Sequence, residues 1–301
     1  MEEETVIIAA LSSLSLPHLS DLTHSLLSLT VHHRRRLSRL LSSPTLFFLT
    51  LQYLHSLSLT NKTLLIARHL LSSLHHITRH FQPPPPHPST TINHRDLDAV
   101  LLLLLLCETH QHDPKALEQP YTEWRPILSK FYSDTMLTIG CTGGGTFDGA
   151  VLLPFIEMVS RCRKFIGVMG CDGKEGRELA ASPAAVVALP AVEVSGGGVE
   201  CVICKEEMRE GRDACELPCQ HLFHWICILP WLKKRNTCPC CRFELPSDDV
   251  YGEIERLWDV LAKAGSGKVM IENRYGTIVR HVEESDGLLS PNENANYGGD
   301  V

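Results

Sequence analysis

Apolar residues recur at helical intervals through the first eighty residues of the chain. The first set comprises Leu19, Leu22, Leu26, Leu29, Leu37, Leu40 and Leu41, and the second comprises Leu64, Leu65, Leu70, Leu71, Leu74, Ile77 and Phe81. Spacings of three and four residues are typical of one face of an amphipathic helix. Ser43-Pro44-Thr45 and Thr60-Asn61 interrupt the pattern with residues that favour helix ends, so we expect three amphipathic helices in this region.

A proline-rich segment separates this region from further apolar runs. Residues 83–88 are mostly proline, which predicts a stiff spacer. Residues 97–107 are almost entirely aliphatic and include six consecutive leucines from Leu101. This run is shorter than the ~20 residues that span a bilayer, so it predicts a buried helix. Residues 121–137 and 148–165 also show helical patterns.

The C-terminal part of the chain is patterned differently. Ile254, Leu257, Trp258 and Leu261 share one face of a predicted helix over residues 251–264, which we expect to pack beside the preceding module or to bind a partner. Residues 268–282 predict a short hairpin that turns near Arg274-Tyr275-Gly276. The last fifteen residues are rich in Asn and Gly, a composition typical of disorder.

Composition and charge place the chain among globular proteins that bind something other than nucleic acid. The 301 residues are 44% hydrophobic and 21% charged, and the net charge is -7. Residues 22–95 carry eight Lys or Arg and no acidic residue, whereas residues 247–301 carry eleven acidic and five basic residues. The basic, Ser-rich segment would also suit organelle targeting or a membrane surface. Because residues 1–4 are largely acidic, an ordinary helical bundle is the favoured interpretation.

Eight cysteines and histidines lie close together in the second half of the chain. Their spacing is regular, with pairs separated by one or two residues and longer intervals of fourteen and ten residues: Cys201, Cys204, Cys219, His221, His224, Cys227, Cys238 and Cys241. Zinc prefers thiolate and imidazole ligands in sets of four, so these residues predict two zinc sites. No secretory signal precedes them, which disfavours a disulfide framework. We expect Cys241 rather than Cys240 as the last ligand, and Cys215 as a buried small hydrophobic residue.

This ligand order resembles that of RING-H2 fingers, a form of the ubiquitin-ligase RING domain. The resemblance implies a cross-brace of two structural Zn²⁺ ions, in which Cys201, Cys204, His224 and Cys227 hold the first ion and Cys219, His221, Cys238 and Cys241 hold the second. It implies a small α+β domain that follows a mainly α N-terminal region. Metal binding supplies the folding free energy that so short a segment lacks. A PHD finger is disfavoured because histidines occupy both central positions.

The same resemblance implies an enzyme that forms no thioester itself. RING domains bind a ubiquitin-charged conjugating enzyme (E2) and promote transfer of ubiquitin to a substrate lysine. Ile203, Trp231 and Pro239 match the apolar E2-binding positions of the family, and we expect them to form an exposed patch. Arg242 matches the basic linchpin that contacts both E2 and ubiquitin. The alternative is a non-catalytic zinc scaffold, which would not need all four of these residues.

These patterns divide the chain into seven segments, namely an amphipathic helical region (1–82), a Pro-rich spacer (83–92), a second helical region (93–194), a Gly-rich hinge (195–200), the finger (201–242), a C-terminal helix and hairpin (243–285) and a tail (286–301).

A closer resemblance covers the N-terminal region and the finger with its tail. Residues 9–29, 32–38, 64–74 and 242–249 are similar to those of plant amyloplast-associated RING-H2 ubiquitin ligases of shoot gravitropism. This implies residence at the plastid, on its cytosolic face, contact with the organelle surface through the N-terminal helices, and an effect on how the amyloplast engages actin. The alternative location is the cytosol.

Overall fold

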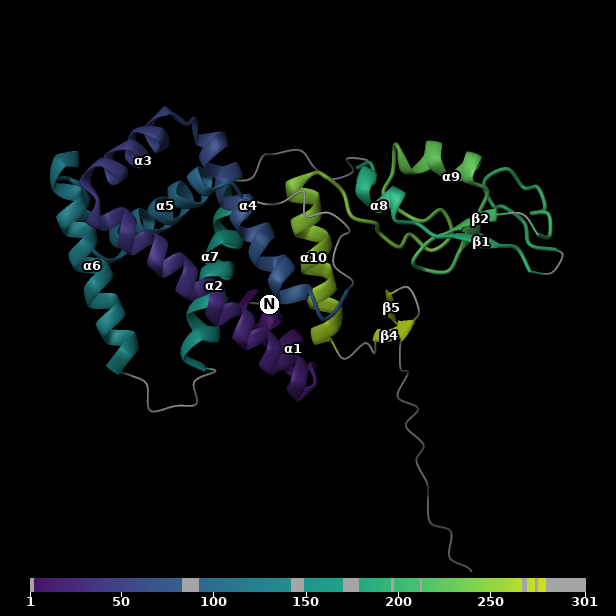
Figure 1. Cartoon of the computed structure of the whole chain (residues 1–301), viewed down its shortest axis with the longest axis horizontal. Helices are drawn as coiled ribbons and strands as arrows, with labels where there is room; N and C mark the ends of the chain where they lie inside the picture. The colour runs from purple at the N-terminus through teal and green to yellow at the C-terminus, as the bar shows by residue number, and fades with distance from the viewer. Residues whose placement is uncertain are drawn as a thin grey trace, which may run out of the picture.

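The computed structural model describes residues 3–82, 92–141, 149–169, 179–195, 198–211, 213–266, 270–273 and 276–279. A body of long helices forms one end of the molecule and a smaller unit with short strands forms the other (Figure 1). The predicted Pro-rich spacer and the predicted disordered tail lie outside the described residues. The mainly helical fold with a small two-site domain agrees with the fold class predicted from the sequence.

The first eighty residues form four helices rather than three. They are α1 (Glu3–Ser12), α2 (Leu16–Ser42), α3 (Pro44–Ser56) and α4 (Leu59–Thr78). The additional helix, α1, has no polar face in its sequence pattern and buries four residues. The Ser43 side chain accepts from the backbone N–H of Leu46 and caps α3, as its position before Pro44 predicts. The next break lies slightly earlier than expected, because Ser58 rather than Thr60 caps α4.

Four further helices complete this part of the chain. They are α5 (His94–His112), the short 3-10 helix η1 (Pro114–Leu117), α6 (Tyr121–Cys141) and α7 (Gly149–Met169). The leucine run lies in α5, where Ala99, Val100, Leu101, Leu102 and Leu105 are buried. Its residues reach two apolar clusters, since Val100 packs with α1, α2, α4 and α7, whereas Leu102 and Leu105 pack with α2, α3 and α6. The leucine-rich segments therefore form a bundle, with α5 shared between its two cores.

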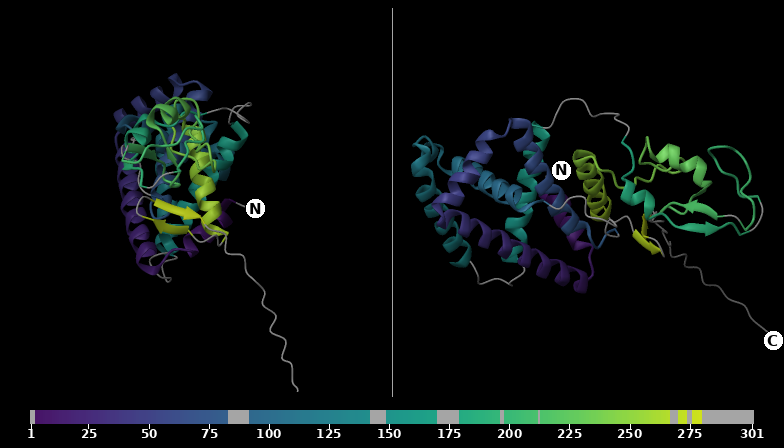
Figure 2. Two further views of the ribbon diagram at one scale, coloured as in Figure 1. Left: turned by 90° about the vertical axis from the view of Figure 1, so that its right-hand side faces the viewer. Right: turned by 45° about the horizontal axis from the view of Figure 1, so that its top comes forward.

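Helix α10 (Val250–Gly265) belongs to this bundle although it follows the zinc ligands in sequence. Its buried residues Ile254, Leu257, Trp258 and Leu261 join the core built by α1, α4 and α7. Figure 2 shows α10 beside the N-terminal helices in both views. The helix was expected to pack beside the zinc module or to bind a partner. Instead its apolar face packs against the chain's own first and fourth helices.

The smaller unit contains α8 (Pro183–Val187), β1 (Ala191–Glu193), β2 (Asp213–Glu216), β3 (Leu222–Phe223) and α9 (Trp225–Leu232). The strands form one antiparallel sheet in the order β1-β2-β3, with Val192 opposite Ala214 and Cys215 opposite Phe223. β1 precedes the Gly-rich segment that the sequence pattern interprets as a hinge. The zinc-binding unit therefore begins earlier than residue 195, because the chain on both sides of that segment contributes to one sheet.

Two short strands follow α10. β4 (Met270–Asn273) and β5 (Gly276–Val279) pair antiparallel, with Asn273 opposite Gly276, in the segment where a hairpin was expected. Among the described residues, no helix combines the length and the hydropathy that a membrane span requires.

Candidate metal centre

The eight predicted ligands come together in two groups of four. Cys201, Cys204, His224 and Cys227 form one group, and Cys219, His221, Cys238 and Cys241 form the other. In each group the candidate ligand atoms all lie within 4.8 Å of one another. The groups alternate along the sequence, so each site is closed by segments from both halves of the finger. This is the cross-brace pairing that the resemblance implied.

Two Cys-x2-Cys loops provide the outer clasps, and their backbones are built alike. The N–H of Cys201 donates to the carbonyl of Glu206 at 2.9 Å, and the N–H of Lys205 donates to the carbonyl of Cys201 at 2.7 Å. The N–H of Cys238 likewise donates to Phe243 at 2.8 Å, and that of Arg242 donates to Cys238 at 3.0 Å.

The residue after each clasp adopts a left-handed backbone conformation. The φ angles are 63° at Lys205 and 60° at Arg242. This conformation is unfavourable for residues other than glycine. It turns the chain back so that both cysteines of each pair face the same site.

The central ligands complete the two sites. The Sγ of Cys204 and the Nδ1 of His224 are 3.4 Å apart, as are the Sγ of Cys219 and the Nδ1 of His221. The Sγ of Cys227 lies 4.0 Å from the Nδ1 of His224. Zinc–sulfur and zinc–nitrogen bonds of about 2.3 and 2.0 Å in a tetrahedron place such atoms ~3.5 Å apart. The residues present therefore fit two Zn²⁺ ions with closed ligand shells.

Hydrogen bonds stabilise the thiolate form of one cysteine in each site. Burial raises the pKa of Cys201, but N–H groups of Cys204, His224 and Ile203 outweigh it and hold the pKa at about 6. The pKa of Cys238 is lowered to about 5, chiefly by a hydrogen bond from Cys219. Thiolate is the form that binds zinc, so a lowered pKa at one cysteine of each group favours metal binding.

The two cysteines that were excluded as ligands lie outside both groups. Cys215 is fully buried in the apolar cluster of the zinc-binding unit, as predicted, and burial raises its pKa to about 12. Cys240 is exposed beside the second site, and its N–H lies 3.4 Å from the Sγ of Cys238.

The residues predicted to bind E2 differ in exposure. Ile203, Trp231 and Pro239 are each half-buried, and Arg242 is exposed. Trp231 donates its Nε1–H to the carbonyl of Thr237 at 2.7 Å, which fixes α9 against the loop that leads to Cys238. Arg235 lies over the Trp231 ring, 5.1 Å from its centroid.

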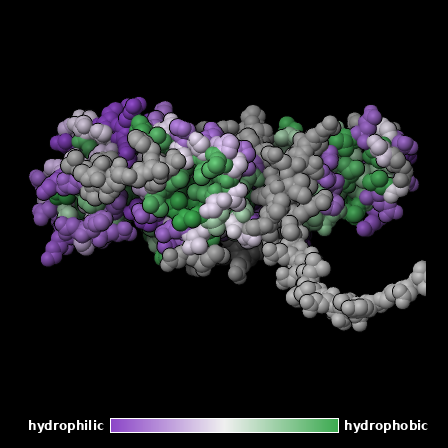
Figure 3. All heavy atoms as spheres, turned by 90° about the horizontal axis from the view of Figure 1, so that it is seen from below, coloured by the Kyte–Doolittle hydropathy of each residue, from purple (hydrophilic) through white to green (hydrophobic). Residues whose placement is uncertain are grey.

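Sequence reasoning missed three exposed apolar residues of the finger. Ile226 is 84% exposed, and Val202 and Leu229 are both more than two-fifths exposed. Hydrophobic side chains are visible at this end of the molecule in Figure 3. The helical pattern of α9 carries this signal for two of them, because Ile228 and Leu232 are buried four residues apart on one face and Ile226 and Leu229 fall outside that spacing.

A model of the Ring finger domain matches residues 199–242. Over nearly its whole length the chain is 56% identical to the Arabidopsis thaliana E3 ubiquitin-protein ligase SGR9, amyloplastic, an alignment of 279 residues that covers 88% of this chain and 98% of that protein. Both helical and zinc-binding parts of the chain are therefore shared with that relative.

Two further relatives align with about a quarter of this chain. The Drosophila melanogaster E3 ubiquitin-protein ligase RNF181 homolog is 51% identical over 25% of this chain and 55% of its own length. The zebrafish (Danio rerio) E3 ubiquitin-protein ligase RNF181 is 47% identical over 25% of this chain and 52% of its own length.

Proposed function

This chain belongs to the RING-type E3 ubiquitin-protein ligases, and on that premise we propose that its zinc-binding unit recruits a ubiquitin-charged E2 and promotes direct transfer of ubiquitin to substrate lysines. The observation that carries this proposal is the pair of complete, closed ligand sets. A closed shell leaves no coordination position for catalysis by the metal, so the ions stabilise the domain. The contribution to transfer is then positional.

The E2-binding face would be built around Ile203, Trp231 and Pro239. Their half-buried side chains are anchored in the unit and still present apolar surface, which is the usual condition of a residue that contributes strongly to an interface. Two further apolar residues are exposed close to these in sequence. Val202 precedes Ile203, and Leu229 lies two residues before Trp231. We include them as additional apolar contacts of the same face.

Arg242 would position the E2–ubiquitin conjugate. Its backbone is fixed by the second clasp, while its guanidinium is exposed and able to donate to two partners at once. No nucleophile of this chain is needed, because the thioester is carried by the E2. Holding the conjugate in one orientation raises the rate at which a lysine attacks it.

Self-ubiquitination in a reconstituted reaction tests this function. We expect Cys219→Ala to abolish the product and Arg242→Ala to lower its rate at least about tenfold with zinc content unchanged. Lys205→Ala is the matched control, because Lys205 is a basic, exposed residue with the same left-handed backbone at the other clasp. Full activity of both Arg242→Ala and Cys219→Ala would contradict this assignment, and absence of product from the wild-type protein would favour a non-catalytic zinc scaffold.

The location proposed for the ligase is the cytosolic face of the amyloplast. Support comes from the relative named amyloplastic, which aligns with 88% of this chain, and from the bundle that supplies a surface distinct from the finger. A full-length fluorescent fusion tests it, with protease treatment of isolated plastids to distinguish the outer face from the interior. Deleting residues 1–82 would be unsuitable, since α1 and α4 share a core with α10. Uniform cytosolic fluorescence would contradict the proposal.

The resemblance to ligases of shoot gravitropism extends the proposal to amyloplast movement. We propose that ubiquitin transfer at the organelle surface alters how the amyloplast engages actin. Amyloplast displacement after reorientation should differ between plants that express the wild-type chain and plants that express Cys219→Ala. Identical displacement in the two plants would show that amyloplast movement does not depend on the ligase activity of this chain.

A further inference from the structure

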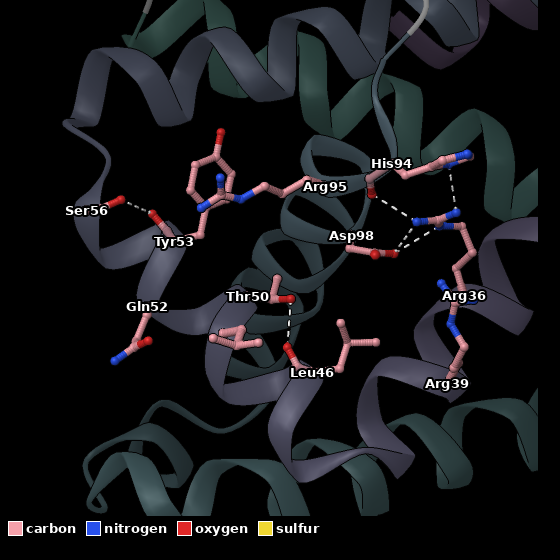
Figure 4. A pocket seen from close by; sticks show the side chains of 11 residues that line it. Arg36, Arg39, Leu46, Thr50, Gln52, Tyr53, Ser56, His94, Arg95 and Asp98 are labelled. Carbon is pink, nitrogen blue, oxygen red and sulfur yellow. Dashed lines mark hydrogen bonds and ion pairs between the residues drawn. The ribbon is translucent and has the colours of Figure 1, made fainter.

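A cavity of about 830 Å³ is lined by residues of the helical bundle and by none of the zinc-binding unit. Its walls come from the second half of α2, from α3 and from the start of α5. We call it the α3 pocket. Figure 4 shows Arg36 and Arg39 of α2 on one side and Arg95 of α5 with Tyr53 on another, with Leu46 and Thr50 of α3 between them.

The charge of the α3 pocket is positive. Three arginines and one aspartate line it, which leaves a net of two positive charges. The aspartate, Asp98, is already engaged, since its Oδ1 accepts from the Nε of Arg36 at 2.9 Å. Asp96, on the same helix turn, is also occupied and buried, accepting from the Tyr53 hydroxyl at 2.7 Å. Both nearby carboxylates are thus turned toward the protein.

Two of the arginines are free to meet a ligand. Arg36 is held in place, because its Nη2 donates to the carbonyl of His94 at 2.9 Å and its Nη1 to the Nδ1 of His94 at 3.0 Å. Arg39 and Arg95 are exposed. In the part of the chain that the structure describes, no hydrogen bond joins either guanidinium to another group. Arg95 is oriented by the Tyr53 ring, whose centroid lies 3.9 Å from its Cζ.

The α3 pocket also has an apolar side. Leu46 is half-buried, and Leu49 is 57% exposed at its wall. A binding site that pairs oriented cations with exposed leucines matches a ligand carrying both carboxylates and an apolar side chain. A small inorganic anion would use the cations but would leave the leucines and most of the volume unfilled.

We propose that the α3 pocket binds an acidic segment of a protein substrate, with an apolar side chain of that segment against Leu46 and Leu49. This role rests on the proposed function, because a ligase requires a substrate-docking surface besides its E2-binding one. The concave shape favours a peptide over an anionic membrane, since the arginines line the wall of a cavity rather than a projecting face. The acid-free composition of residues 22–95 limits repulsion of an approaching acidic segment.

Direct binding to the full-length protein tests the proposal. The probe is a labelled glutamate-rich peptide with a central Leu-Phe pair, measured by fluorescence anisotropy against the same peptide with glutamine in place of glutamate. We expect Arg39→Glu and Arg95→Glu each to weaken binding about fivefold or more. Lys130→Glu makes the same charge change at an exposed site on α6, outside the pocket lining, and should leave affinity unchanged.

The outcomes separate this proposal from its alternatives. Equal affinity for the two peptides, or equal affinity of Arg39→Glu, Arg95→Glu and the wild type, would overturn it. Arginine-dependent cosedimentation with phosphatidylglycerol vesicles without peptide binding would replace the substrate by a membrane surface. Self-ubiquitination should be unaffected by both arginine variants, so a failure of peptide binding is distinguishable from a failure of the ligase assignment.

Discussion

The helical bundle and the zinc-binding unit hold their chains in place by different means. The bundle buries large apolar side chains from helices that lie far apart in sequence, from Ile7 in α1 to Leu261 in α10. The zinc-binding unit has short strands and two short helices, and eight ligands in two sets of four hold it together. The stability of the bundle should therefore depend on packing and buried charge, and the stability of the zinc-binding unit should depend on metal.

The two are nevertheless joined through the chain that leaves the zinc-binding unit. The N–H of Ala181 donates to the carbonyl of Leu232 at 2.9 Å and that of Ser182 to Pro246 at 2.8 Å, so the chain that enters the unit is fixed to the chain that leaves it. Asp249 then caps α10, which continues into the bundle core. The finger is therefore carried by the bundle rather than attached as a terminal appendage.

Removal of zinc should have the largest effect and should divide the molecule at this boundary. Structural zinc contributes on the order of 10 kcal/mol to small zinc-folded domains. We expect a strong chelator to abolish the native environment of Trp225 and Trp231 while most of the helical circular dichroism is kept, because the long helices lie in the bundle. Cys219→Ala should give the same division without a chelator. Loss of the helical signal together with the metal would mean that the bundle depends on the finger.

Breaking the buried ion pair of the bundle should destabilise the helices and leave the zinc sites intact. Arg36 and Asp98 join α2 to α5 at 2.9 Å, with side chains only 9% and 11% exposed. Asp98→Ala leaves a buried guanidinium without its carboxylate, which typically costs about 3 kcal/mol or more. Urea denaturation followed by circular dichroism measures the loss, and zinc content should be unchanged.

A surface pair supplies the control for this experiment. Asp21 pairs with Arg79 and His80, but its side chain is 64% exposed. Asp21→Ala should therefore cost less than about 1 kcal/mol. A similar loss of stability in the two variants would show that burial does not make the Arg36–Asp98 pair more important to the bundle than the surface pair.

The zinc site could be predicted from the sequence because its information is local. Each clasp is set by two cysteines with two residues between them, and the order of the eight ligands is enough to identify the module. The assignment of ligands to the two groups came from family resemblance, and spacing alone would have left it open. The exposure of Ile226 does not follow from the ligand spacing, because it depends on which face of α9 packs against the rest of the unit.

The bundle was predictable only as a set of helices. Periodicity identified α2, α4, α6 and α7, but α1 was missed because its ten residues are apolar on most sides. The partners of α10 could not be read from its own pattern, which shows an apolar face without showing what covers it. The α3 pocket depends on three segments brought together by packing, so no short motif reveals it.

Acidification should weaken the bundle through a buried histidine. Burial lowers the pKa of His69 to about 4, and the ring of His33 lies 5.4 Å away, with its own pKa lowered to about 3, chiefly by burial. The unfolded chain has the ordinary value of 6.5, so the stabilisation is complete above that pH and is lost as the pH falls toward 4. From pH 7 to pH 5 this amounts to roughly 2 kcal/mol for His69.

His69→Leu tests this pH dependence. The difference in urea stability between pH 7 and pH 5 should shrink in the variant, because the residue that must stay neutral is gone. Any contribution of the zinc ligands is the same in both proteins and cancels in the comparison. His24→Leu, at an exposed position of α2, should keep the wild-type dependence. If the stability difference between pH 7 and pH 5 were unchanged in His69→Leu, the loss of stability in acid would arise from other residues.

The smallest expected effects are changes in stability at two glycines, and they test whether α10 packs tightly in the bundle. The informative result is the sign of each change. A Cβ added at Gly265 would lie 2.8 Å from the Cβ of Ala9 and 3.1 Å from the backbone N of Ala10, so Gly265→Ala must push α10 away from α1. The cost should be about 1 kcal/mol. A Cβ at Gly167, in α7, would have no neighbour within 4 Å among the described residues, and Gly167→Ala should stabilise the bundle by about 0.5–1 kcal/mol through helix propensity. If α10 were only loosely attached, both substitutions would stabilise. We therefore expect thermal or urea denaturation to show a loss of stability for Gly265→Ala and a gain for Gly167→Ala, because α10, which follows the finger, is part of the bundle core.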